Sequence, residues 1–269
     1  MGAHDRFLLC PPRFYRIAYV INPWMCGNVG RTDEATAHHE WEHLCAALTA
    51  RAAIELVEPA EGLPDMAFVA NAGLVHGDVF VPSRLRFPQR QAETPVVTAW
   101  FRDHGYAVTP LPGEGCFEGE GDALFQPGEP LLWAGYGVRS AREAVDHLAA
   151  LLDVEVVPLR LVDERFYHLD TAFCPLPGGR VVYHPGAFDA EARATMAARI
   201  PADRRYAVDI ADALAFACNA LVADGAYVTS FVSAALRARL ARWGHEVVTC
   251  ALGEFLLAGG GAKCLALSF

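Results

Sequence analysis

The stretch Gly261-Ala-Lys-Cys-Leu-Ala-Leu267 places a cysteine at the start of an apolar run, and a polar residue precedes an apolar run in the same way four more times. The polar positions are Asn71 in FVANAGLV, Asp122 in GEGDALF, Asp170 in YHLDTAFC, Asn219 in ACNALV and finally Cys264. They recur at intervals of about fifty residues, which indicates repeated supersecondary units arranged about an axis. Because equivalent residues in such units point to equivalent places, we expect these five side chains to converge.

Each unit combines one helix with short strands. Helices are expected to start at Thr32 and, with an N-cap, at Thr94. A third helix is expected to begin at Ser140, which opens a capping box with Glu143.

The last unit determines how the architecture closes. Its helix runs from about Ser233 to Trp243, and the unit then lacks a final strand. The N-terminal run 6–10 can supply that strand and close a ring, as terminal strands do in propellers. The sequence therefore predicts one closed α/β domain over residues 1–269. A doubly wound parallel sheet is rejected, since Gly119-Glu-Gly121 neither follows the GxGxxG pattern nor opens a helix.

Composition limits the function classes. The chain has 269 residues, 53% of them hydrophobic, and a formal net charge of −10, which argues against a nucleic-acid surface. No apolar run is long enough to span a bilayer, and the N-terminus does not resemble a signal peptide. The eight cysteines form no CxxC pair, as expected for reduced thiols, so a cytoplasmic location is predicted. A homo-oligomer is compatible with the sequence.

Cys264 and His168 are the strongest candidates for chemistry. A lone cysteine is most often a small buried hydrophobe. A reactive thiol is favoured here by the preceding run Gly259-Gly260-Gly261, which lets the backbone approach a ligand closely, and by the register shared with acids and amides. His168 lies two residues before Asp170, so on a strand both side chains share one face and can act as a general acid–base pair.

A zinc-like motif is set aside. His39-Glu-Trp-Glu-His43 matches HExxH, but Trp41, Leu44 and Leu48 define the buried face of that helix. The two histidines are therefore expected to face solvent, and no metal is predicted.

Four further charged residues indicate a binding site only when they are considered together. Asp65 precedes an apolar run, Glu118 lies in a glycine-rich turn, and Arg90 and Arg139 read individually as surface cations. Carboxylates suit a guanidinium or ammonium group, and arginine suits a carboxylate through bidentate bonding. The set therefore favours a small molecule that carries both kinds of charge.

Four segments of the sequence together resemble a known enzyme family. The segments PDMAFVANAGLV, FEGEGDAL, YHLDTAFCPL and GGGAKCLAL resemble, in order, those of the guanidine-modifying enzymes of the amidinotransferase and arginine deiminase superfamily. The resemblance covers essentially the whole chain and implies a five-bladed α/β-propeller, the pentein fold, with pseudo-fivefold ββαβ repeats. The segment INPWMCGN and Asn71, where related hydrolases usually have Asp, look most similar to the arginine dihydrolases, which release ornithine, ammonia and carbon dioxide.

The resemblance implies the catalytic roles. Cys264 would be the nucleophile that attacks the guanidinium carbon, and His168 the general acid and base. Asp65 and Glu118 would grip the guanidinium group. Neither a cofactor nor a metal is implied.

The resemblance also implies the substrate-binding residues. Arg90 and Arg139 would hold the α-carboxylate of arginine or a close analogue, while Asn22 and Asn71 would line the pocket. Asp170 would support His168.

Lys263 and Asn71 differ from the residues usual in related enzymes, and two alternative functions are compatible with the sequence. Many relatives have histidine where this chain has Lys263, and strand alternation predicts that Lys263 points away from the site. The hypothesis for Asn71 is that loss of one negative charge permits a second reaction cycle on a urea-like intermediate. The alternatives are an arginine deiminase or dimethylarginine dimethylaminohydrolase, which would make citrulline, and a non-catalytic pentein binding module.

Overall fold

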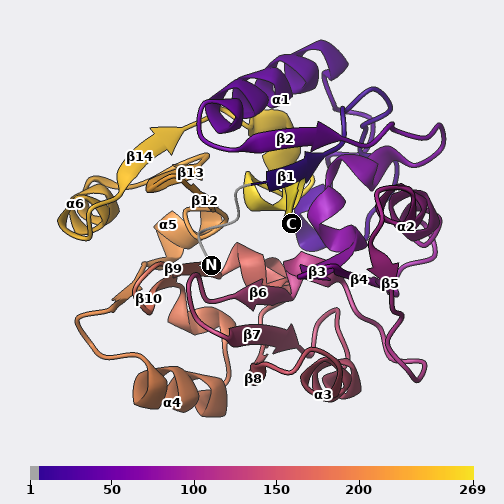
Figure 1. Cartoon of the computed structure of the whole chain (residues 1–269). Coiled ribbons are helices and arrows are strands. Elements are labelled where there is room, and N and C mark those ends of the chain that lie inside the picture. Colours follow the sequence, from indigo (N-terminus) through magenta and orange to yellow (C-terminus); the bar gives the residue numbers. More distant parts are fainter. Residues whose placement is uncertain (1–5) are drawn as a thin grey trace.

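The computed structural model describes residues 6–269, which form five three-stranded sheets around a common centre (Figure 1). In each sheet an antiparallel pair of strands is joined by a third strand that runs parallel to its neighbour, and a helix precedes that third strand, which gives the predicted ββαβ unit. Helices α1, α2, α3, α4 and α6 lie at the outside of the ring. The α/β propeller expected from the sequence is therefore confirmed.

Four blades follow one another directly along the chain. The first contains β3 (Gly73–His76), β4 (Val79–Pro82), α2 (Glu93–Asp103) and β5 (Ala107–Val108). The second contains β6 (Ala123–Phe125), β7 (Leu131–Tyr136), α3 (Arg142–Leu151) and β8 (Glu155–Arg160). The third contains β9 (Phe173–Leu176), β10 (Arg180–Tyr183), α4 (Ala190–Arg199) and β11 (Arg205–Ala207). The fourth contains β12 (Leu221–Ala223), β13 (Ala226–Thr229), α6 (Ala234–Arg242) and β14 (Glu246–Thr249).

The fifth blade joins the two ends of the chain. It contains β15 (Ala266–Ser268), β1 (Arg6–Leu9), α1 (Glu34–Thr49) and β2 (Ala53–Leu56). Strand β1 pairs antiparallel with β15, with Phe7 opposite Ser268, and parallel with β2. The prediction that the run 6–10 supplies the missing strand is confirmed. Two short helices, α5 (Ile210–Leu214) and α7 (Gly253–Leu256), were not expected.

Several helix starts differ from the expectation. Helix α1 is capped by Asp33 rather than Thr32, because the Thr32 hydroxyl accepts a hydrogen bond from the backbone of Ile17. The N-cap of helix α2 is Ala92 rather than Thr94, which lies inside the helix that begins at Glu93. The capping box at Ser140 is wrong: Ala141 is the N-cap of α3, and the Ser140 hydroxyl instead donates to Asp122.

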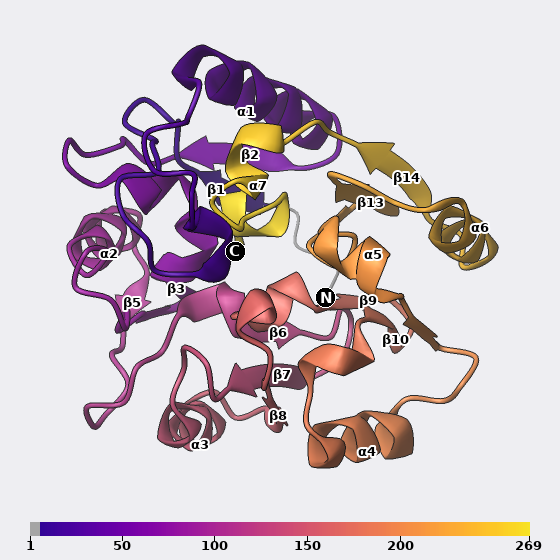
Figure 2. The ribbon, with the colours of Figure 1, turned by 180° about the vertical axis from the view of Figure 1, so that it is seen from behind.

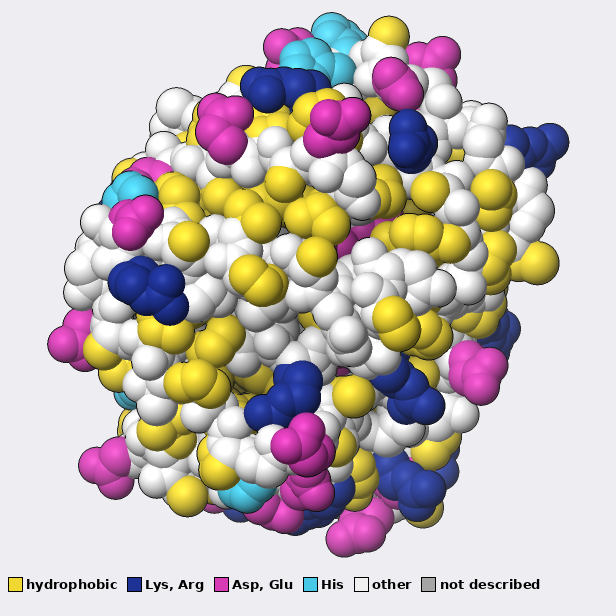
Figure 3. Space-filling view, turned by 90° about the vertical axis from the view of Figure 1, so that its right-hand side faces the viewer, with side chains coloured by type: hydrophobic (Ala, Val, Ile, Leu, Met, Phe, Trp, Pro, Cys, Tyr) yellow, Lys and Arg dark blue, Asp and Glu magenta, His cyan; other side chains and the backbone are white. Residues whose placement is uncertain are grey.

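On the face of the molecule drawn in Figure 3, acidic and basic side chains are interspersed with apolar ones, and neither sign of charge gathers in one large patch. Within residues 6–269, no helix combines the length and the apolarity that crossing a membrane requires.

A buried ion pair ties the inner turns together. Lys263 Nζ lies 2.6 Å from Glu120 Oε2, and the same oxygen accepts a hydrogen bond from the backbone of Ser268 in β15. Both charged side chains are almost fully buried. The pair therefore joins the second blade to the fifth, where the ring closes.

We expect Glu120→Ala to lower the free energy of unfolding by about 3–5 kcal/mol, because it leaves the Lys263 ammonium buried without a partner. The matched control is Asp146→Ala, which breaks the exposed pair with Arg142 and should cost under about 1 kcal/mol. Urea denaturation of both variants measures the difference. Equal losses in the two variants would contradict this assignment.

Candidate active site

The five polar positions of the repeat meet at the centre of the ring. Asn71, Asp170 and Cys264 lie in short 3-10 turns, Asp122 ends such a turn, and Asn219 precedes β12. Each turn leads into the innermost strand of its blade, and all five side chains are buried. The predicted convergence is confirmed.

Cys264 is held between an acid and an amide. Its Sγ donates a hydrogen bond to Asp170 Oδ2 at 3.2 Å and accepts one from Asn219 Nδ2 at 3.2 Å. Burial and the charge of Asp170 raise the pKa of this thiol well above its usual value, although the backbone N–H of Gly261 acts in the opposite direction. In the ligand-free protein Cys264 is therefore a thiol at neutral pH.

His168 faces a second acid. Its Nε2 lies 2.6 Å from Glu118 Oε2, and Arg139 Nη1 donates to the same oxygen at 3.0 Å. Burial alone would raise the pKa of Glu118, but the hydrogen bond with His168 and the charge of Arg139 lower it below its usual value. Glu118 is thus an ionised carboxylate that orients the imidazole.

The expected pairing of His168 with Asp170 on one strand face is wrong. His168 has extended backbone, but Asp170 lies in the following 3-10 turn. The two side chains therefore diverge, one toward Glu118 and the other toward Cys264. Asp170 contacts the thiol rather than supporting the imidazole.

Asp65 is held by a tyrosine and lies near an arginine. Its Oδ2 accepts a hydrogen bond from the Tyr19 hydroxyl at 3.0 Å and lies 3.8 Å from Arg90 Nε. Its Oδ1 has no hydrogen-bond partner among the described residues. Burial raises the pKa of Asp65 even though Arg90 opposes that shift.

Both arginines are buried and already paired with acids. Arg90 bonds Glu93 through Nε and Nη2 and donates from Nη1 to Asn71 Oδ1 at 2.9 Å. Arg139 bonds Glu118 as described and lies over the ring of Tyr167 at 4.6 Å. Neither is the surface cation that its local sequence suggested.

Asn22 fixes the segment that covers the pocket. Its Oδ1 caps a 3-10 turn by accepting from the backbone of Trp24 and Met25, and its Nδ2 donates to the Ala258 carbonyl at 2.9 Å. In Figure 2 this segment between β1 and α1 lies toward the viewer, near α7.

These elements enclose a narrow pocket, here called the substrate pocket, with about 260 Å³ of empty volume. It is lined by residues from the covering segment, the inner turns and both arginines: Ile21, Asn22, Met25, Asp65, Phe68, Asn71, Arg90, Arg139, Tyr167, Ala258 and Cys264. The remaining candidates, Glu118, His168 and Asp170, contact this lining through Arg139 and Cys264. All nine residues predicted from the sequence therefore belong to one cluster.

Two glycines make this packing possible. A Cβ on Gly121 would lie 2.5 Å from Asn71 Nδ2 and 3.0 Å from the His168 ring. Gly119 has a positive φ of 59°, and a Cβ there would clash with the backbone of Gly73. The Gly-Glu-Gly segment thus serves close approach of the inner turns.

Sequence reasoning missed the buried partners Glu93, Glu120 and Tyr167 and the partly buried Tyr19. Lys263 was expected to point away from the site, and it does so, but from a 3-10 turn rather than a strand. No pattern in the sequence distinguishes these residues from surface ones.

The HExxH helix has the expected orientation. His39 and His43 are exposed, whereas Glu40 between them is buried and accepts hydrogen bonds from the backbone of Gly253 and Glu254 at the start of α7. Among the described residues there is no group of three or more side chains placed to hold a metal ion.

Comparison with known proteins gives a consistent result, although no protein-family model matches the chain. The bifunctional arginine dihydrolase/ornithine cyclodeaminase ArgZ of Synechocystis is 48% identical over 99% of this chain, which spans 38% of that protein. The N(G),N(G)-dimethylarginine dimethylaminohydrolase of Mycobacterium tuberculosis is 40% identical over 97% of this chain and 85% of its own length.

A solved structure agrees with these relatives. The N-terminal domain of ArgZ, an arginine dihydrolase crystallised with its substrate, superposes with a TM-score of 0.96 at 48% identity, covering 98% of this chain and 97% of that one. By sequence, fold and site geometry, the chain belongs to the guanidine-modifying superfamily that contains the arginine dihydrolases and dimethylarginine dimethylaminohydrolases.

Proposed function

We propose that residues 1–269 form a single catalytic domain that hydrolyses the guanidinium group of L-arginine through a covalent adduct on Cys264 and releases ornithine, ammonia and carbon dioxide. The observation that carries this proposal is the burial of the thiol in one narrow pocket with Asp65 and Asp170 and next to the His168–Glu118 pair. The similarity to arginine dihydrolases supports it. The reaction needs no cofactor or metal.

Recognition of the substrate follows from charge. The guanidinium of arginine is always protonated, so buried carboxylates such as Asp65 and Glu118 can hold it in place of water. A cation beside Cys264 would in turn favour the thiolate and offset the burial that keeps the group protonated. In this proposal the substrate activates its own nucleophile.

The α-carboxylate would be held by the two arginines. A guanidinium group has five N–H donors, and Arg139 uses Nη1 for Glu118 and Nη2 for the carbonyl of Ile21. Donors therefore remain for a substrate carboxylate. Arg90 and Asn22 would complete this end of the pocket.

The chemical steps can be assigned to two groups. The thiolate attacks the guanidinium carbon, an S–C bond forms, and the C–N bond to one terminal nitrogen breaks. His168 donates the proton with which that nitrogen leaves as ammonia. Water deprotonated by the same imidazole then cleaves the adduct and leaves a urea-like intermediate in the pocket.

Asn71 would decide whether the reaction continues. Its Oδ1 accepts from Arg90, while its Nδ2 is buried without an acceptor among the described residues. An amide N–H can donate to the carbonyl oxygen of a urea, whereas a carboxylate at that position would repel it. The free donor therefore supports a second cycle on the intermediate, with loss of a second ammonia.

The competing function is a hydrolase that stops at citrulline, and the similarity to a dimethylarginine dimethylaminohydrolase favours it as the second candidate. A non-catalytic binding module is less well supported, because it would not need a buried thiol and an imidazole–carboxylate pair at one pocket. Eight unpaired cysteines support the cytoplasmic location that we propose for the protein.

Cys264→Ser is expected to reduce ornithine formation from arginine at least about 1,000-fold, because the hydroxyl is a far weaker nucleophile. Cys26→Ser, at an exposed cysteine, should retain wild-type activity. Ornithine is quantified by amino-acid analysis. Full activity in Cys264→Ser would rule out the covalent mechanism.

Product stoichiometry tests the role of Asn71. The wild-type protein should release two ammonia molecules per ornithine, whereas Asn71→Asp should release one ammonia per citrulline. Asn71→Gln serves as a control for altered side-chain length at unchanged charge. Ammonia and amino acids are counted in the same reaction. Wild-type protein that converts arginine stoichiometrically to citrulline and stops would establish the competing function.

The pH dependence of thiol reactivity tests the electrostatics. Because burial and the charge of Asp170 raise the pKa of Cys264 well above its usual value, its alkylation by iodoacetamide should still accelerate as the pH rises above 9, where an ordinary cysteine is already a thiolate. Asp170→Asn removes a negative charge, lowers the pKa and should move the profile to lower pH, whereas Asp146→Asn should not move it. Modification of the Cys264 peptide is followed by mass spectrometry. A shift to higher pH in Asp170→Asn would contradict the assignment.

A further inference from the structure

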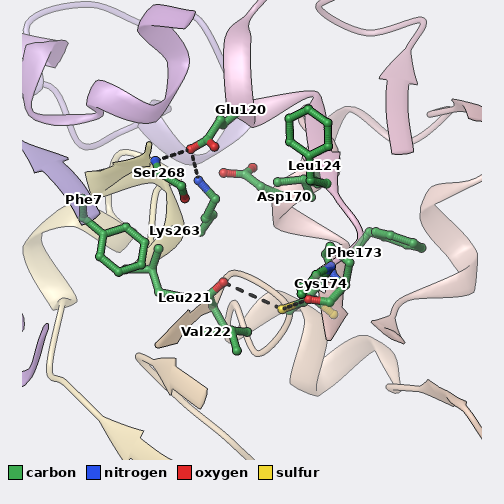
Figure 4. Close-up of a pocket in the computed structure, with 15 residues that line it drawn as sticks. Phe7, Glu120, Leu124, Asp170, Phe173, Cys174, Leu221, Val222, Lys263 and Ser268 are labelled. Atoms are coloured by element: carbon green, nitrogen blue, oxygen red, sulfur yellow. Dashed lines mark hydrogen bonds and ion pairs between the residues drawn. The ribbon is translucent and has the colours of Figure 1, made fainter. Parts of the chain in front are cut away.

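A second cavity, here called the rear cavity, lies on the other side of the Asp170–Cys264 contact and shares no lining residue with the substrate pocket. Its empty volume is about 540 Å³, part of which is open to solvent. Its walls are mainly apolar and come from the inner strands β6, β9 and β12, with Leu124, Phe173 and Leu221 among them. Figure 4 shows Asp170, Lys263 and Glu120 gathered at one end of it.

The polar end of the rear cavity has one unmatched acceptor. Lys263 is neutralised by Glu120 at 2.6 Å, which leaves the charge of Asp170 without an ion-pair partner of its own. Asp170 Oδ2 is used by the thiol, but Oδ1 is buried and has no hydrogen-bond partner among the described residues. Burial raises the pKa of Asp170 to about 7, with Lys263 lowering it and Glu120 raising it. A small N–H donor would satisfy this oxygen.

The proposed reaction creates such a donor at this place. Each ammonia would leave while the amino-acid part of the substrate is still in the substrate pocket, first as the adduct on Cys264 and then as the urea-like intermediate. Because that pocket is narrow, a substrate that fills it would leave little room for ammonia to depart beside it. Asp170, 3.2 Å from the thiol, separates the reacting carbon from the rear cavity.

We propose that ammonia leaves the active site through the rear cavity, passing Asp170, and that the same cavity binds small primary ammonium ions. This inference rests on the proposed function. Asp170 Oδ1 accepts the hydrogen bond of the departing nitrogen, and the apolar walls admit neutral ammonia or a short alkyl chain. They disfavour the zwitterionic amino acid, because Lys263 is already paired with Glu120 and leaves the carboxylate without a cationic partner there. The amino-acid substrate thus enters through the substrate pocket, and ammonia leaves through the rear cavity.

Binding can be tested without turnover. Val222 is a partly exposed lining residue, so Val222→Trp should fill the mouth of the rear cavity, while Val222→Ala leaves it open. Propylammonium chloride should raise the melting temperature of the wild-type protein and of Val222→Ala above that in equimolar sodium chloride. Val222→Trp should lose most of this increase. No increase in the wild-type protein, or an equal increase in Val222→Trp, would overturn the proposed binding.

Kinetics test the exit route. At saturating arginine, propylammonium should lower kcat of the wild-type protein without changing KM, because it enters from the rear. Val222→Trp should lower kcat at least fivefold, change KM less than twofold and leave alkylation of Cys264 unchanged, whereas Val222→Ala should match the wild-type protein. Competition between propylammonium and arginine, or an unchanged kcat in Val222→Trp, would overturn the route.

The two proposals fail separately. If wild-type protein released no ammonia from arginine, the proposed function would be wrong, while the thermal measurement would still decide binding in the rear cavity. If Val222→Trp does not fold, as judged by circular dichroism, Val222→Phe replaces it, and the inhibition pattern of the wild-type protein already decides the site of propylammonium binding.

Discussion

The structure depends on satisfying five polar side chains that the ring buries at its axis. A buried polar atom without a hydrogen bond costs about 1–3 kcal/mol, so the turns must bond to one another across blade boundaries. Asn219 does so three times, to the Asp170 carbonyl, the Cys264 thiol and the backbone N–H of Lys263. Asp122 joins Ser140 of its own blade to the backbone of Leu169 in the next. The position of the thiol is therefore set by hydrogen bonds between neighbouring blades.

Several buried side-chain atoms in the described residues have no hydrogen-bond partner, and some of them belong to the active site. Most buried charges are paired, as in Arg90 with Glu93 and Lys263 with Glu120. By contrast, Asp65 Oδ1, Asn71 Nδ2 and Asp170 Oδ1 have no partner among the described residues. Two acceptors and one donor around a nucleophile match a cation with many N–H groups that is converted to a carbonyl.

The sequence predicted the architecture well because the repeat carries it. The period, the position of the N-terminal strand and the residues gathered at the centre all follow from local patterns that recur. The predictions that failed depended on the local backbone conformation and on a side-chain partner that the local sequence does not reveal. Ser140 looked like a helix cap because its local context fits one, but its hydroxyl is taken by Asp122 of the preceding turn. His168 and Asp170 were expected to act together because a strand was assumed, and one 3-10 turn separates their directions.

Closure of the ring by its two ends links activity to folding in a particular way. Cys264 lies two residues before β15, the strand that pairs with β1, so the nucleophile is positioned only after the most distant parts of the chain have met. Contacts of this sequence separation form slowly. Local opening of this one blade would displace the thiol while four blades stay folded. Catalytic activity would then be lost at lower denaturant than secondary structure, and it would return last on refolding.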